Sequence, residues 1–240
     1  MNGLHKEARD LAGGIRGKLD GFRCPDVVLC PPFLAIPAVR EVLAGSPLRL
    51  GAQDVFWKPK GAFTGEVSAA MLLDAGCTHV VIGHSERREL GETDTMVSEK
   101  VRAALGAGLT PIMCVGERLE EREKGVTFGV VERHVAQGLK GLGPEQVAKV
   151  VIAYEPVWAI GTGKTATPAQ AQEVHVFIRK LVQQAAGPAV AEGLRILYGG
   201  SVKPDNIKDL MAQKDLDGAL VGGASLEVDS FVKIARYREC

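Results

Sequence analysis

The sequence lacks an excess of either charge, a long apolar run and any paired cysteine motif. Its 29 Lys and Arg residues balance 29 Asp and Glu residues, so no dominant field attracts a nucleic acid or an anionic membrane. The most apolar stretch, residues 27–39, is too short to span a bilayer, and residues 1–7 contain no apolar signal core. The five cysteines include no Cys-x-x-Cys pair, which argues against a disulfide framework or a zinc site. We therefore expect a soluble, cytoplasmic protein with neither nucleic-acid nor membrane partners.

What the sequence does contain is glycine and a regular series of short apolar runs. Glycine accounts for 29 of 240 residues, about 12% against an average of about 7%. Seven apolar runs, rich in β-branched residues, recur at a mean spacing of about 32 residues, the length of one strand with its crossover helix. They cover residues 27–30, 48–52, 79–83, 110–115, 150–154, 195–198 and 219–221.

Continuous apolar runs, rather than alternating ones, indicate strands buried on both faces of a parallel sheet. Such a sheet is either open and doubly wound or closed as a (β/α)8 barrel. The even spacing and the absence of a Gly-x-Gly-x-x-Gly motif after the first run favour the barrel, in one α/β domain over residues 1–240. Residues 4–19 show helical periodicity with no strand before them, so we expect a barrel whose first β-strand is missing from this chain.

Two further helices are expected to start at proline. Thr167 followed by Pro168 combines a capping residue with proline in the first helical position. Pro204 after Lys203 suggests a similar start.

The first candidate for chemistry is His84, where the run 79–83 ends. Ser85 or Glu86 would begin the next helix, and a helix start disfavours a protonated imidazole. We therefore expect a neutral His84 that can donate a hydrogen bond. The alternative is a structural histidine.

The second candidate is Glu155, directly after the run 150–154. A carboxylate is costly to bury there unless it is paired or acts as a general base. The following residues, Pro-Val-Trp-Ala-Ile-Gly-Thr-Gly, suit a lid with an apolar middle and bending glycines. Gly161 to Thr165 also resemble a nucleotide-binding loop, but the glycine required five residues before Gly163 is Trp158.

The third candidate is a pair of Gly-Gly dipeptides, at residues 199–200 and 222–223, which follow the last two runs. In a barrel the last two loops are the common phosphate site, because their backbone N–H groups face the ligand. The alternative for each pair is a tight turn.

Residues 53–68 form a connection longer than usual between a strand and a helix. Its aromatic residues suggest a partner surface, although the loop could also pack on itself.

Taken together, these motifs resemble those of the triosephosphate isomerases from Met1 to the C-terminus, in the same order and spacing. The motifs are Gly-Ala-Phe-Thr-Gly-Glu at 61–66, Ile-Gly-His-Ser-Glu-Arg-Arg at 82–88, Ala-Tyr-Glu-Pro-Val-Trp-Ala-Ile-Gly-Thr-Gly-Lys at 153–164, Tyr-Gly-Gly-Ser-Val at 198–202 and Leu-Val-Gly-Gly-Ala-Ser at 220–225.

The resemblance implies a (β/α)8 barrel that interconverts dihydroxyacetone phosphate and D-glyceraldehyde 3-phosphate without a metal or organic cofactor. Glu155 would be the base and His84 the group that polarises the carbonyl, a pairing for which this family is itself the standard example. Glu86 matches a helper carboxylate and Cys114 a buried position near the base. The resemblance further implies phosphate binding by Gly161, Ser201, Gly222 and Gly223, and a homodimer in which Thr64 reaches the neighbouring subunit.

One departure concerns the family's first-strand motif, Asn-Trp-Lys-Met-Asn-Gly, because this chain begins with its last three residues, Met1, Asn2 and Gly3. The active-site Asn and Lys of that motif are absent. Three interpretations follow: an isomerase whose recorded start is an internal methionine, which we favour; a folded but inactive barrel that acts as a binding or regulatory partner; and a different phosphate-handling barrel enzyme. The third is disfavoured by the specific combination of His84, Glu155 and the lid.

Overall fold

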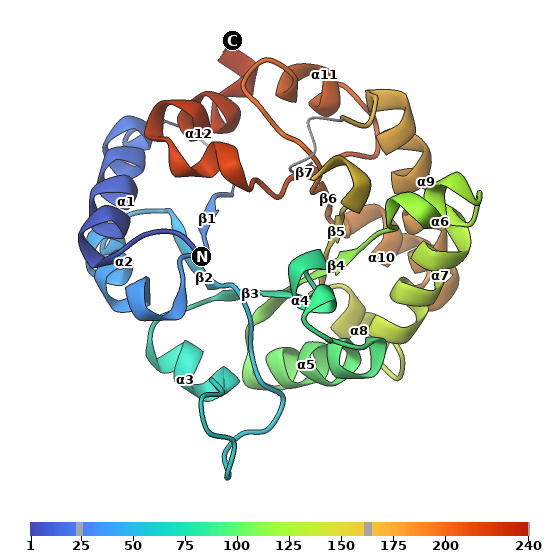
Figure 1. The fold of residues 1–240 in the computed structure, drawn as a ribbon, viewed down its shortest axis with the longest axis horizontal. Helices are drawn as coiled ribbons and strands as arrows, with labels where there is room; N and C mark the ends of the chain where they lie inside the picture. Colours follow the sequence, from blue (N-terminus) through green and yellow to red (C-terminus); the bar gives the residue numbers. More distant parts are fainter. Residues whose placement is uncertain (23–25, 161–164, 240) are drawn as a thin grey trace.

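A computed structural model describes residues 1–22, 26–160 and 165–239. These residues contain a seven-stranded, wholly parallel sheet in which every strand pairs with the next strand along the chain. The sheet curls around a central axis with the helices outside it (Figure 1). The strands are β1 (Val28–Leu29), β2 (Arg49–Ala52), β3 (His79–Ile82), β4 (Thr110–Val115), β5 (Val151–Tyr154), β6 (Ile196–Tyr198) and β7 (Gly218–Ala219). This arrangement confirms the expected barrel architecture.

The helices are α1 (His5–Leu19), α2 (Ile36–Leu43), α3 (Ala69–Asp74), α4 (Ser85–Glu89), α5 (Asp94–Ala107), α6 (Leu119–Glu123), α7 (Thr127–Gly138), α8 (Pro144–Val147), α9 (Pro168–Ala186), α10 (Pro188–Gly193), α11 (Ile207–Met211) and α12 (Val228–Ala235). None of the described helices is both long enough and apolar enough to cross a membrane.

The strands separate two apolar layers. On β3, Val80 and Ile82 pack into the large cluster between strands and helices, whereas Val81 joins a smaller cluster with Ile112 and Cys114. Because successive side chains of a strand point to opposite faces, this division places the smaller cluster inside the curled sheet. Burial on both faces explains why the strands appear in the sequence as continuous apolar runs.

The two ends of the sheet, β1 and β7, are covered by a direct contact between α1 and α12. The helices are so close that a Cβ atom on Gly14 would lie 2.7 Å from Cγ2 of Val228, and Lys18 pairs with Asp229. Within the described residues α1 is the first element. The ring of helices is therefore continuous at the place where the sheet has its two edges (Figure 1).

One predicted helix start is confirmed and the other is wrong. Thr167 caps α9, since its side chain accepts a hydrogen bond from the Gln170 N–H at 3.2 Å. The helix expected at Pro204 begins three residues later, at Ile207. The side chain of Asn206 accepts from the Lys203 N–H (2.8 Å) and donates to the Ser201 carbonyl (2.9 Å), which holds this segment as a turn.

Candidate active site

Strands β3 and β5 deliver His84 and Glu155 to the same edge of the sheet, because both residues follow the carboxyl ends of parallel strands. The His84 Nε2 lies 2.9 Å from the Glu155 Oε1. Glu155 is 2% exposed, and it also accepts hydrogen bonds from the Ser85 N–H at 3.0 Å and the Ser85 Oγ at 3.3 Å. The two residues singled out from the sequence are therefore in direct contact.

The protonation of His84 is set by its two neighbours. Its Nδ1 accepts a hydrogen bond from the Glu86 N–H (3.3 Å) as the capping group of α4, so the proton lies on Nε2 and faces Glu155. Burial lowers the pKa of His84, but the hydrogen bond and charge of Glu155, with smaller effects from Glu86 and Glu89, outweigh it and raise the pKa above its usual value. The helix start, which we expected to favour a neutral His84, is opposed here by the nearby carboxylate of Glu155, which raises the pKa of the imidazole.

Glu86 lies beside the histidine rather than in the buried cluster. Its side chain is 77% exposed, and its Oε2 is 3.8 Å from the Nδ1 of His84. It faces the ring nitrogen opposite to the one that contacts Glu155.

The backbone around Glu155 is closely packed: Gly116 leaves no room for a side chain, and Gly199 leaves little. A Cβ atom on Gly116 would lie 1.7 Å from the Glu155 carbonyl oxygen, and one on Gly199 would lie 3.0 Å from the Glu155 Cγ. Cys114 is fully buried behind the carboxylate, and burial, then the charge of Glu155, raises the pKa of its thiol far above the usual value. Cys114 therefore acts as a neutral group that contacts the base.

A second buried carboxylate, Glu117, was missed by sequence reasoning. It is 0% exposed and accepts hydrogen bonds from the Tyr154 hydroxyl at 3.1 Å, the Trp158 Nε1 at 2.9 Å and the Arg122 Nη1 at 3.0 Å. Burial, then the charge of Glu117, raises the pKa of Tyr154. The signal in the sequence was the same as for Glu155, a carboxylate shortly after a buried strand.

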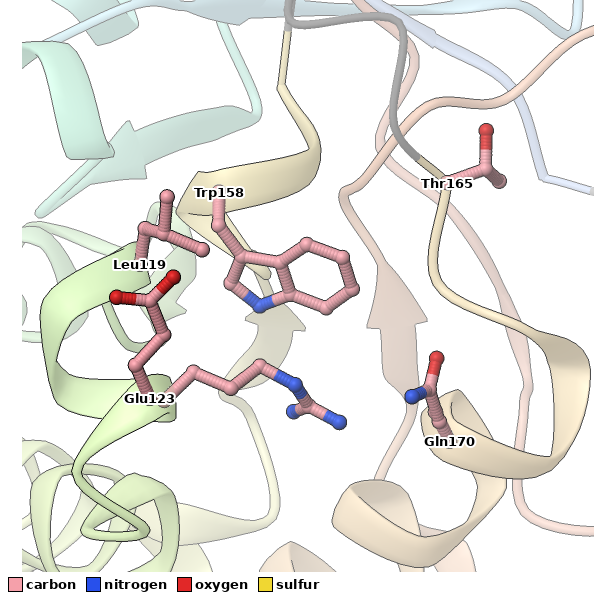
Figure 2. A pocket seen from close by; sticks show the side chains of 6 residues that line it. Leu119, Glu123, Trp158, Thr165 and Gln170 are labelled. Atoms are coloured by element: carbon pink, nitrogen blue, oxygen red, sulfur yellow. The ribbon is translucent and has the colours of Figure 1, made fainter.

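Trp158 also borders a surface hollow of about 530 Å³. In Figure 2 its indole lies between the helix that carries Leu119 and Glu123 and the segment that carries Thr165 and Gln170. The guanidinium of Arg122 stacks 4.8 Å from the centre of the indole ring. This hollow contains neither His84 nor Glu155, so it is separate from the paired residues.

The glycine loops begin at the same edge of the sheet, since β6 and β7 pair through Tyr198 and Ala219. Gly222 and Gly223 are exposed, and a Cβ atom on either would meet nothing within 4 Å. Ser201 is half-buried at the end of the β6 loop. The fourth predicted phosphate residue, Gly161, lies outside the described residues, as does Lys164.

The long connection after β2 packs on itself, as one of the two interpretations expected, and part of it is exposed. Phe56 packs against Trp57 and Phe63, with ring centres 4.1 and 4.7 Å apart, so the loop packs on itself. Phe63 is nevertheless 40% exposed and Thr64 is exposed. The segment leading into α3 extends beyond the ring of helices (Figure 1).

Across the described ranges, no three His, Cys, Asp or Glu side chains gather closely enough to hold a metal ion.

Comparison with known proteins agrees with this arrangement. The sequence profile of the family described as triosephosphate isomerase matches residues 1–238. The chain belongs to the triosephosphate isomerase family. It is 55% identical to a triosephosphate isomerase from Roseiflexus sp., over 96% of this chain and 91% of the relative. It is 56% identical to one from Pelobacter propionicus (98% and 95%) and 57% identical to one from Moorella thermoacetica (99% and 95%). Family membership therefore rests on nearly the full length of the chain.

Proposed function

We propose that this chain is a triosephosphate isomerase that interconverts dihydroxyacetone phosphate and D-glyceraldehyde 3-phosphate through an enediolate, a reaction of glycolysis and gluconeogenesis. The observation that carries the proposal is the buried contact between the Glu155 Oε1 and the His84 Nε2, at 2.9 Å. It unites a carboxylate base and an imidazole donor at the edge of the sheet where barrel enzymes bind substrate. No metal or organic cofactor is needed for this chemistry.

In the proposed reaction, Glu155 removes a proton from one carbon of the triose and returns it to the adjacent carbon. The His84 Nε2–H donates a hydrogen bond to the substrate oxygen and exchanges its proton with the enediolate. Glu155 raises the pKa of His84 while it is charged. Once Glu155 carries the substrate proton that support is lost, and the imidazole then gives up its own proton more readily. Glu86, beside Nδ1, is proposed as a helper that adjusts the same ring.

The phosphate group is proposed to bind at the backbone N–H groups of Gly222 and Gly223, with Ser201 and Gly161. The exposure of the two glycines and the open space above them support this role. A short 3₁₀ helix begins at Gly223, so its first N–H groups are free of internal helical partners and can face an anion. This arrangement binds an anionic substrate although the chain has no net charge.

We also propose that the family's first strand, with its Asn and Lys, belongs between β1 and β7 and would precede Met1. Within the described residues, β1 and β7 each pair with only one neighbouring strand, and α1 contacts α12 outside them; both observations support this assignment. Residues 1–240 are proposed to form one domain in a cytoplasmic homodimer, with the loop around Thr64 against the second subunit. The exposure of Phe63 and Thr64 supports that contact.

The decisive experiment measures turnover of both triose phosphates by the 240-residue chain and by a version preceded by a strand ending in Asn-Trp-Lys. We expect the extended version to be faster by about 100-fold or more, since a fixed cation next to a developing negative charge has an effect of that size. Rates within tenfold of each other would contradict the assignment of the first strand. No turnover by either version would contradict the function.

The assignment of the base is tested by comparing Glu155→Asp with Glu145→Asp, both made in the extended version. Glu145 is exposed on α8 and is the matched control. Shortening Glu155 moves the carboxylate by about one methylene, which should reduce kcat about 100-fold or more because the reacting atoms no longer align. Glu145→Asp should leave kcat unchanged. Equal rates for the two variants would rule out Glu155 as the base.

A further inference from the structure

Behind the site, outside β3 and β4, a chain of polar contacts starts at the residue before His84. The Arg88 Nε donates to the Gly83 carbonyl oxygen at 2.9 Å. The Arg88 Nη1 pairs with the Asp94 Oδ1 at 2.6 Å. Asp94 is the first residue of α5, so the loop that carries His84 is fastened to the start of that helix.

The same chain continues to α7 through His134, a side chain that is 6% exposed. Helices α5 and α7 pack side by side (Figure 1). The His134 Nε2 lies 3.8 Å from the Asp94 Oδ1, and its Nδ1 accepts a hydrogen bond from the Gly116 N–H at 3.3 Å. One aspartate is thus shared by an arginine that holds Gly83 and a histidine that holds Gly116.

This geometry selects one form of the imidazole. Two groups that can only donate face the ring, the Gly116 N–H at Nδ1 and the Arg133 Nη2 at Nε2, 3.2 Å away, and a neutral imidazole accepts from only one of them. Arg133 has another acceptor, the Asp94 Oδ2, which its Nε contacts at 3.2 Å. We therefore assign the acceptor role to Nδ1, which receives the Gly116 N–H, and the proton to Nε2, on the side of Asp94. His134 therefore holds Gly116 only while it is neutral.

Gly116 matters because its backbone supports Glu155. Its Cα faces the Glu155 carbonyl so closely that a Cβ atom would be 1.7 Å away. On either side, the Glu155 N–H donates to the Val115 carbonyl at 2.8 Å and the Val157 N–H donates to the Glu117 carbonyl at 3.0 Å. A displacement of Gly116 is thus transmitted to the base and to the residues that follow it.

We propose that His134 is a positioning residue for the isomerisation: as a neutral imidazole it fixes Gly116 and, through Asp94 and Arg88, Gly83, and so keeps Glu155 and His84 at contact distance. Protonation of Nδ1 removes the acceptor of the Gly116 N–H. We call the contacts of His134 with Gly116 and Asp94 the clamp, which this protonation opens. The kinetic part of the inference rests on the proposed isomerase function, whereas the protonation state does not.

The charged groups that face His134 are Asp94 from α5, Arg88 from α4 and Arg133 from its own helix. Burial lowers the pKa of His134 to about 4, the two arginines lower it and Asp94 opposes them. The unfolded chain has the ordinary pKa of about 6.5. The neutral clamp therefore contributes its full stability above about pH 6.5 and loses it as the pH falls towards 4.

The kinetic test compares His134→Gln with His134→Leu at pH 7.5. The glutamine amide offers an oxygen to Gly116 and an N–H to Asp94, so kcat should stay within about threefold of the unsubstituted chain. Leucine fills similar space without an acceptor, and we expect about a tenfold or greater loss in kcat with KM changed less than twofold, because small misplacements of reacting groups are costly. Equal kcat values for two folded variants would overturn the positioning role.

The second test does not depend on activity. Urea unfolding between pH 7 and 4.5 should show the folding equilibrium constant of the unsubstituted chain falling more steeply than that of His134→Gln, by up to tenfold per pH unit. The other histidines are present in both proteins and cancel. Parallel pH profiles would overturn the neutral clamp. If neither the unsubstituted chain nor its extended version turns over substrate, the proposed function fails, while urea unfolding still decides the protonation state of His134.

Discussion

Two carboxylates, Glu117 and Glu155, follow neighbouring strands, and both are almost completely buried, yet their surroundings differ. Glu117 accepts from the Tyr154 hydroxyl, the Trp158 indole and the Arg122 guanidinium. Glu155 accepts from the N–H and Oγ of Ser85 and lies against the His84 imidazole and the neutral Cys114 thiol, none of which is a permanent cation. A carboxylate with a full set of donors and a permanent cation is held as an anchor, whereas one that faces a histidine can exchange protons.

Of the substitutions that test this difference between the two carboxylates, Glu155→Gln should have the largest effect on kcat. The variant retains the shape of the side chain but cannot accept a proton, so kcat should fall about 1000-fold or more, as expected when a general base is removed. The free energy of unfolding should change by less than about 1 kcal/mol, since no permanent cation is left unpaired. Steady-state kinetics and urea unfolding measure the two quantities. Retention of a tenth of the activity would refute the assignment of the base.

Glu117→Gln should give the opposite result. It leaves Arg122 without its carboxylate and weakens hydrogen bonds to a charged acceptor, which costs about 2–3 kcal/mol in the free energy of unfolding. The effect on kcat should be smaller, about tenfold, because Trp158 and the residues after Glu155 lose their support. Glu120→Gln, at an exposed site on α6, the helix that carries Arg122, is the matched control. A stability equal to that control would mean that Glu117 is not an anchor.

The smallest effect is expected for Cys114→Ala, which removes the neutral group behind Glu155. The loss of one buried sulfur should cost about 1 kcal/mol in the free energy of unfolding, and kcat should stay within about threefold because Ser85 and His84 still hold the base. Thermal unfolding and steady-state kinetics measure both values. A loss of kcat comparable to that of Glu155→Gln would show that Cys114 takes part in the chemistry.

The strands and the contact between His84 and Glu155 could be predicted because they depend on local patterns and on the rule that parallel strands end at one edge. Glu117 has the same local pattern as Glu155, and its role is revealed only by its partners in the structure, Arg122 nearby and Tyr154 and Trp158 from β5 and the segment after it. The contact between His134 and Gly116 could not be predicted, because it depends on how α7 packs beside β4. The start of α11 was misplaced because the side chain of Asn206 stabilises a turn that competes with the helix.

The packing of α1 against α12 has a consequence for the order in which the chain folds. Each strand pairs with its successor in sequence, so most of the sheet can assemble by closing loops of about 30 residues. The contact of Gly14 with Val228 instead joins the two ends of the chain. Contacts between residues so far apart form late, since the entropy of the intervening chain must be lost first. We therefore expect the ring to close last, with its two terminal helices as the seam.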